Sequence, residues 1–247
     1  MAILLILGSG PDVVHAREMP RTAFDAIATI NNAWAVRPDW DYLIHPEDFP
    51  ENRRPAEVLP NQRIITADSF VSAQNAYGGF VYAGGTMAFT ASYWALKALL
   101  PRVIAYLGCD MIYPANKQTH FYGTGAADPL RSDVTLRSLE AKSARLLALA
   151  ARQGCALINL SRGPSRLVFP RADLQGLRYA QPLSFNPAQV AAALQAEADL
   201  GYMVASGRYW EEAERFDTVA LDRIDLLWSD AAGVGSELKG LDRIKDD

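Results

Sequence analysis

Ala2-Ile-Leu-Leu-Ile-Leu7, followed directly by Gly8-Ser9-Gly10-Pro11, is the stretch that decides the fold. A continuous apolar run that ends in glycine is typical of a parallel strand buried on both faces of a sheet. In an open parallel sheet, the loop after such a strand lies at the carboxyl edge, where ligands bind. The stretch therefore predicts an α/β fold with a ligand site at its first loop.

Five further apolar runs have the same character, at residues 26–30, 42–44, 63–66, 103–107 and 156–160. Strands buried on both faces need covering helices, and two such helices are expected between the runs. The first runs from Gly85 to Leu100, before Pro101; the second runs from an N-cap at Ser132 to a stop at Gly154. A strand follows each helix, which predicts a Rossmann-like, doubly wound, mostly parallel sheet.

The last part of the chain has a helical pattern without a strand. Asn186 and Pro187 suit a helix start, Gly207 interrupts that helix, and residues 208–216 suit a further short helix. We expect a Rossmann-like nucleotide-binding domain at residues 1–180 and a helical C-terminal extension at residues 181–247 packed on it. Core packing within the chain is favoured, over a contact in a homo-oligomer, for the aromatic residues Tyr202, Tyr209, Trp210 and Phe216.

Composition excludes several classes of protein. The 247 residues are 50% hydrophobic, and their net charge of −4 lacks the basic patch of a nucleic-acid binder. The sequence shows no signal segment and no apolar run of about 20 residues, so we expect a cytoplasmic protein without a membrane span. The two cysteines, Cys109 and Cys155, adjoin apolar runs and are expected to be buried free thiols.

The first loop suits phosphate binding, because the small residues Gly8, Ser9 and Gly10 let backbone amides approach an anion, with Pro11 beginning the next segment. A structural turn explains the same residues equally well. The full dinucleotide fingerprint fails because Val13 stands where its third glycine belongs. A NAD(P)-dependent oxidoreductase is therefore the weakest of the functions considered.

Two further segments supply backbone and amide groups. Gly84, Gly85 and Thr86 precede a helix, so they present either free amides to an anion or simply a capped turn. Asn31, Asn32 and His45 follow the second and third strands, where they can contact a sugar or base, although asparagine there is often only a turn residue.

The loop after the fifth strand supplies the groups for proton transfer. Gly108 and Asp110 end that strand, and the loop continues with Tyr113, Asn116, Lys117, His120 and Tyr122. Only three histidines occur in the chain, which favours a functional role for His120 over a surface position. The sequence thus has four polar segments expected at the carboxyl ends of strands in one sheet. Because such strand ends lie at the same edge, we expect the four segments to share a crevice.

The order of these motifs resembles that of the bacterial sialyltransferases of glycosyltransferase family 42. It also resembles the related group that contains archaeal 6-hydroxymethyl-7,8-dihydropterin pyrophosphokinases and motility accessory factors. The similarity covers residues 2–170 and rests on these segments: Gly8 to Pro11, Asn31, His45-Pro46, Gly84 to Thr86 and Gly108-Cys-Asp110.

The sialyltransferase resemblance implies transfer from a CMP-sugar without a metal. Gly8, Ser9, Gly10 and Asn31 would hold the nucleotide, and Tyr113 with Tyr122 would face the departing phosphate. The sequence differs from the sialyltransferase pattern in two respects. Asp12 replaces the usual serine after the first loop, and no histidine follows His120 to match the family's downstream base. His120 is therefore the candidate acid or base by default.

Two alternatives remain beside a nucleotide-sugar-dependent transferase. A Mg²⁺-ATP-dependent pyrophosphokinase would need metal-binding carboxylates, for which Asp110, Glu47 and Asp48 are available. A non-catalytic nucleotide-binding accessory protein is the other, motivated by the missing histidine and by Asp12. In each case the partner is a small nucleotide substrate, and no tightly bound cofactor is expected.

Overall fold

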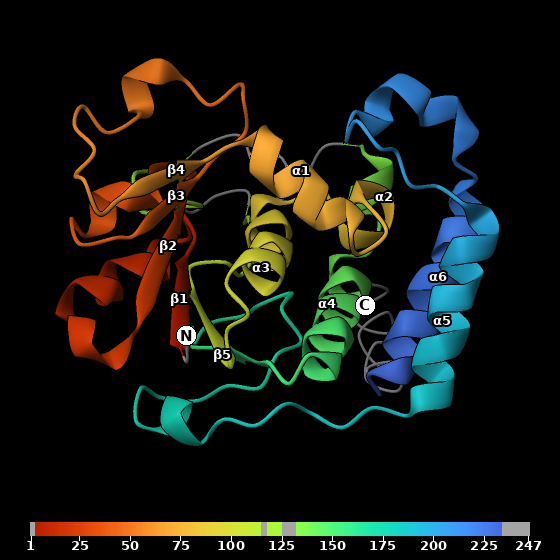
Figure 1. Cartoon of the computed structure of the whole chain (residues 1–247). Coiled ribbons are helices and arrows are strands. Elements are labelled where there is room, and N and C mark those ends of the chain that lie inside the picture. The colour runs from red at the N-terminus through yellow and green to blue at the C-terminus, as the bar shows by residue number, and fades with distance from the viewer. Residues whose placement is uncertain (1–2, 115–117, 125–131, 234–247) are drawn as a thin grey trace, which may run out of the picture.

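A computed structural model describes residues 3–114, 118–124 and 132–233. Its centre is one six-stranded, entirely parallel sheet in the order β4-β3-β2-β1-β5-β6 (Figure 1). The strands are β1 (Ile3–Leu7), β2 (Ala26–Ile30), β3 (Tyr42–Ile44), β4 (Arg63–Ile65), β5 (Val103–Leu107) and β6 (Ala156–Asn159). This confirms the Rossmann-like, doubly wound α/β fold. The strand order reverses between β1 and β5, and ligand crevices form at such reversals.

One face of the sheet is covered by α-helices. These are α1 (Ala67–Asn75), α2 (Phe80–Ala83), α3 (Met87–Ala98) and α4 (Leu139–Arg152). Leu4 and Ile6 of β1 belong to the apolar core on this face, whereas Leu5 and Leu7 belong to the core on the other. Both faces of β1 are thus buried, which is why its sequence is apolar without alternation.

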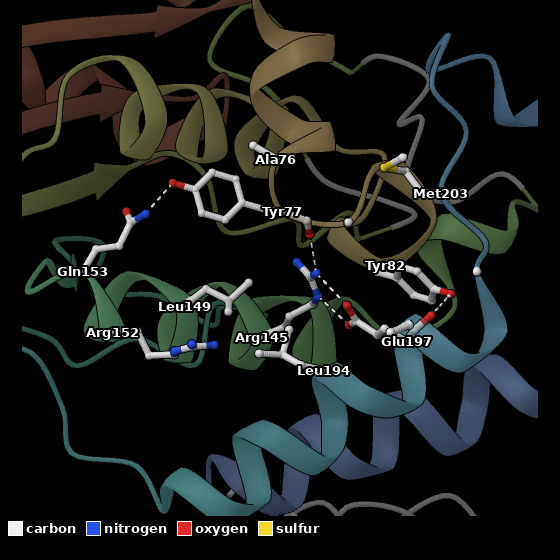
Figure 2. A pocket seen from close by; sticks show the side chains of 13 residues that line it. Ala76, Tyr77, Tyr82, Arg145, Leu149, Arg152, Gln153, Leu194, Glu197 and Met203 are labelled. Carbon is white, nitrogen blue, oxygen red and sulfur yellow. Dashed lines mark hydrogen bonds and ion pairs between the residues drawn. The ribbon is translucent and has the colours of Figure 1, made fainter.

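Two C-terminal helices, α5 (Pro187–Leu200) and α6 (Thr218–Ala231), lie beside α4 (Figure 1). Glu197 of α5 binds the buried Arg145 of α4, with Nε to Oε1 at 2.7 Å, and Trp228 of α6 donates to the same oxygen. Arg145 also donates to the carbonyl of Tyr77 (Figure 2). We call this polar cluster, together with the Lys142–Asp225 ion pair of α4 and α6, the helix junction.

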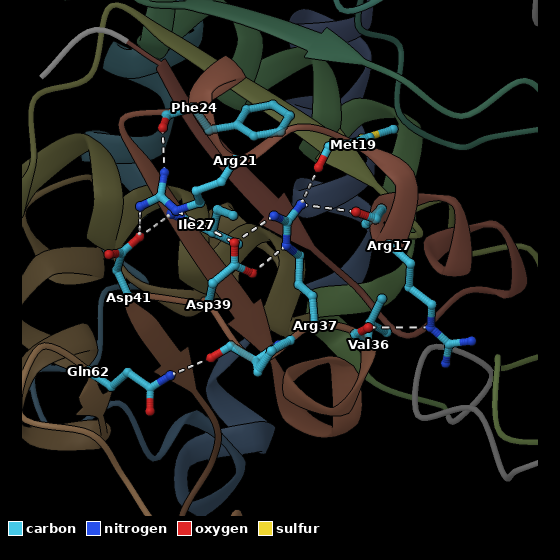
Figure 3. A network of polar contacts seen from close by, with 12 residues as sticks. Arg17, Met19, Arg21, Phe24, Ile27, Val36, Arg37, Asp39, Asp41 and Gln62 are labelled. Carbon is cyan, nitrogen blue, oxygen red and sulfur yellow. Dashed lines mark hydrogen bonds and ion pairs between the residues drawn. The ribbon is translucent and has the colours of Figure 1, made fainter.

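The other face carries 3₁₀ segments, of which η1 (Pro11–Glu18) follows β1 and η3 (Asn31–Val36) follows β2. Arg37 fastens them together: its guanidinium donates to the carbonyls of Ala16 and Met19 and to the Asp39 carboxylate (Figure 3). The hydrogen bond from Arg37 lowers the pKa of Asp39. The network holds η1 against the sheet, and η1 begins at the ligand edge.

Two expectations about helix bounds were wrong. The helix expected from Ser132 begins instead at Leu139, because Asp133 caps a separate short turn (Val134–Leu136) and Ser138 then caps α4. Helix α5 ends at Leu200, where Gly201 adopts a left-handed φ of 61°, so Gly207 lies beyond it. Helix α6 lies within the expected helical extension, but it was not predicted as a separate element.

The aromatic residues of the C-terminal extension differ in their burial. Tyr209 and Phe216 are buried and Tyr202 is partly buried, whereas Trp210 is 62% exposed. Residues 234–247 of the expected extension lie outside the described residues. Within the part that is described, no helix combines the length and apolar character needed to cross a membrane. Cys109 and Cys155 are buried free thiols.

Candidate functional site

The loops after β1 and β5 meet through their backbones. The amide of Gly8 donates to Leu107 O at 2.9 Å, and that of Gly10 donates to Gly108 O at 2.8 Å. A Cβ on Gly8 would lie 2.3 Å from Gly108 O, so no larger residue fits there without displacing the loop. The glycines therefore serve the close approach of two strand ends, which forms the floor of a cleft.

This cleft, which we call the strand-end cleft, has a volume of about 500 Å³. The sequence-predicted residues that line it are Gly8, Ser9, Gly10, Pro11, Asn31, Asn32, Gly85, Thr86, Gly108, Asp110, Tyr113, His120 and Tyr122. Segments from four separate parts of the chain thus share one cavity, at the point where the strand order reverses.

His45 and Gly84 do not line the cleft. The His45 ring is only 3% exposed, with its Nδ1 donating to Pro46 O at 2.8 Å and its face against Phe49. Gly84, with a φ of 90°, packs against Phe89 and Lys142. Both are support residues: the neighbouring Pro46 and Gly85 line the cleft in their place.

One end of the cleft has buried oxygen atoms whose hydrogen-bonding capacity is unused. Ser9 Oγ and Asn31 Oδ1 have no hydrogen-bond partner among the described residues. Asn31 also has a φ of 52°, an uncommon conformation for a residue other than glycine. Thr86 caps α3 at this end by accepting from Phe89 N at 3.3 Å, so the remaining first-turn amides and the positive end of α3 lie at the cleft. The features suit a phosphorylated ligand.

His120 lines the same cleft beside two tyrosines. Its ring centroid is 5.0 Å from that of Tyr122 and 6.0 Å from that of Tyr113. The Thr119 hydroxyl is 2.9 Å from Nδ1. The amide of Phe121 donates to Ser9 O at 3.0 Å, which ties this segment to the first loop. Burial lowers the pKa of His120, which favours the neutral ring that can accept a proton.

Asp110 is held from β6. Asn159 Nδ2 donates to Asp110 Oδ1 at 3.1 Å, and Arg166 N donates to the Asp110 carbonyl at 3.0 Å. The next residue, Met111, has a φ of 55°. Asn159 was not predicted as a site residue, although it ends a strand just as Asn31 follows one. Asp110 is thus oriented by a second strand end.

The carboxylates of the strand-end cleft are Asp12, Asp48 and Asp110, and Glu47 does not line it. No group of three or more histidine, cysteine or acidic side chains suited to a metal ion occurs in the described part of the chain. Arg53 and Phe49 also line the cleft, from the long β3–β4 connection, where no motif marked them. Asn116 and Lys117 of the predicted loop lie outside the described residues.

A different hollow, of about 470 Å³, lies at the helix junction and includes Tyr77, Tyr82, Arg145 and Glu197 (Figure 2). There Arg145 binds Glu197 and the Tyr93 hydroxyl, and the Tyr82 hydroxyl donates to Glu197 O. Polar groups that already bind one another leave little for a ligand. The strand-end cleft is therefore the better candidate site.

Comparisons of the chain with protein-family models, with curated proteins and with solved structures found no match.

Proposed function

We propose that the chain is a transferase that uses a nucleotide-activated sugar, with a CMP-sugar as donor. The observation that carries the proposal is that one cleft contains both the unpartnered Ser9 Oγ and Asn31 Oδ1 and the His120 ring beside two tyrosines. The first set suits binding of a phosphorylated nucleotide, and the second suits proton transfer and contact with a leaving phosphate.

A mononucleotide suits the cleft better than a dinucleotide. In the dinucleotide fingerprint, the third glycine allows a helix to pack closely on the sheet. Here Val13 is fully buried at that position, and its side chain occupies the space beside Gly108. The segment after the loop is a 3₁₀ turn rather than a long α-helix. These differences argue against a NAD(P) site.

In the proposed reaction, His120 takes the proton from an acceptor hydroxyl as its oxygen bonds to the anomeric carbon of the donor. The bond from that carbon to the phosphate oxygen breaks, and CMP leaves with the electron pair. In this reaction the hydroxyl groups of Tyr113 and Tyr122 donate hydrogen bonds to the departing phosphate.

A thermal-shift titration with CMP, CDP, ATP and GTP, each with and without Mg²⁺, tests the nucleotide. CMP should stabilise the protein without Mg²⁺, by about 2.7 kcal/mol at about 100 times its Kd. Stabilisation by ATP only in the presence of Mg²⁺, with no response to CMP, would instead support the pyrophosphokinase.

Release of CMP from CMP-N-acetylneuraminic acid tests the chemistry. Binding of CMP without any consumption of this donor, or of other CMP-sugars, would favour a nucleotide-binding accessory protein over a transferase. Turnover that His120→Ala leaves unchanged would remove His120 from the mechanism.

A further inference from the structure

A second, larger hollow adjoins the strand-end cleft. It has a volume of about 940 Å³ and lies between η1 and the segment that follows β6. We call it the lateral groove; its charged lining residues other than histidine are Asp12, Glu18, Arg162, Arg171 and Asp173. Asp12 lines both hollows, so the two cavities meet at this carboxylate.

One wall of the groove is held in place. Arg171 donates to the carbonyls of Ser161 and Gly163, and its backbone forms a β-bridge with Asn159 at the end of β6. Gly163 lines the strand-end cleft, and a Cβ built on it would lie 3.8 Å from Asp12 Oδ2, so this part of the segment lies beside Asp12. Hydrogen bonds and the β-bridge thus hold one wall of the groove to the end of β6.

Several polar side chains in the groove have unused hydrogen-bonding capacity. Asp12, His15 and Arg162 make no hydrogen bond or ion pair with any other residue that the structure describes. Their donors and acceptors are left for solvent or for a ligand. Leu107 and Leu160 add an apolar surface.

The charges indicate the class of ligand. The carboxylates of Asp12, Glu18 and Asp173 would repel an anion, and the guanidinium groups of Arg162 and Arg171 would repel a cation. A neutral sugar meets neither repulsion. Its hydroxyls donate to carboxylates and accept from guanidinium groups, and its C–H face suits the apolar surface.

We propose that the lateral groove is the acceptor site and binds a neutral, polyhydroxylated molecule whose reactive hydroxyl enters the strand-end cleft past Asp12. This inference rests on the proposed transferase function. It also assigns a role to Asp12, which a phosphate would avoid: its carboxylate accepts hydrogen bonds from acceptor hydroxyls and leaves the proton transfer to His120.

Backbone amide NMR of the full chain, with lactose and CMP as separate probes, tests the proposal. Lactose should shift the signals of Ser161, Ala172 and Asp173, which line the groove, whereas CMP should shift those of Gly8 and Gly10, which line the cleft. Arg162→Gln should weaken the lactose response about tenfold, because it removes a charged hydrogen-bond donor. Arg152→Gln, at an exposed arginine outside the groove, is the matched control and should leave the response unchanged.

Failure of lactose to shift the groove signals, while CMP still shifts the first loop, would overturn the acceptor site and leave the proposed function standing. A groove that responds to inorganic phosphate but not to lactose would overturn the neutral ligand class. Failure of CMP itself would count against the proposed function.

Discussion

The helix junction pairs each of its buried charged side chains with an opposite charge, although Asp225 Oδ2 has no partner among the described residues, whereas the strand-end cleft leaves two buried neutral side chains with unpartnered oxygens. At the junction, Arg145 meets Glu197 at 2.7 Å and Lys142 meets Asp225 at 2.8 Å, all four side chains being nearly inaccessible. In the cleft, Ser9 Oγ and Asn31 Oδ1 are buried without a partner in the described chain, and Asn31 and Met111 have positive φ.

The helix junction contributes to stability, whereas the strand-end cleft has features that suit ligand binding. Buried charges without partners are costly, so the junction joins α4, α5 and α6 only while its pairs are intact. Asp225 shows the strain of this arrangement, since burial raises its pKa although Lys142 opposes the shift. Unsatisfied groups and unusual backbone angles in the cleft also cost stability, and such costs are typical of places where a ligand binds.

The largest effect is expected from a substitution that removes an ion pair of the helix junction. Glu197→Gln removes the negative charge beside Arg145 and leaves a buried guanidinium uncompensated. We expect the free energy of unfolding to fall by about 3–5 kcal/mol, measured by urea denaturation. Asp222→Asn is the matched control, because its ion pair with Arg137 is partly exposed, with side-chain exposures of 37% and 48%, and should contribute under about 1 kcal/mol. Equal losses in the two variants would mean that burial does not distinguish the pairs.

The next effect concerns turnover in the cleft. His120→Ala should lower the rate of CMP release from a CMP-sugar by about 10²–10⁴-fold, since it removes the proton acceptor. In the unaltered protein, the rate should fall as acid protonates the ring. Because burial lowers the pKa of His120, the midpoint should lie below its usual value of about 6.5.

A rate measurement from about pH 5 to pH 8 checks this, and the acid limb should vanish in the variant. Tyr179→Ala, at a side chain that is 79% exposed and outside the cleft, should change neither the rate nor its pH dependence. An acid limb that persists without His120 would assign the titration to another group.

The smallest expected effect concerns a single cleft residue, Asn31, and the affinity for CMP. Asn31→Gly removes the unpartnered oxygen while permitting the φ of 52°. The Kd for CMP should rise about tenfold by calorimetry, with no loss of thermal stability. Leu100→Gly, at an exposed residue with a φ of 49° away from the cleft, should keep the stability without changing the Kd. A destabilised Asn31→Gly with normal CMP binding would make Asn31 a structural residue.

All six strands could be predicted because each contains a short apolar run, and strands buried on both faces, such as β1, β2 and β5, have that pattern locally. The edge strand β4 is the exception in burial, since Arg63 and Ile64 are exposed. Helix ends were harder. Ser132 is as good a cap as Ser138, and only the turn capped by Asp133 decides between them. Helix α6 was missed although the sequence marks it locally: Asp217 caps its start, and the buried residues Leu221, Ile224 and Trp228 recur at helical spacing.

The sequence by itself determined the parallel sheet and the polar strand exits, since both depend on residues close together in the chain. The tertiary structure decided which exits share a cavity. In the folded chain His45 is buried in the core, Arg53 lines the cleft, and Asn159 donates a hydrogen bond to Asp110. It also placed Asp12 between two hollows. Such outcomes depend on how distant segments pack, and packing leaves no local pattern in the sequence.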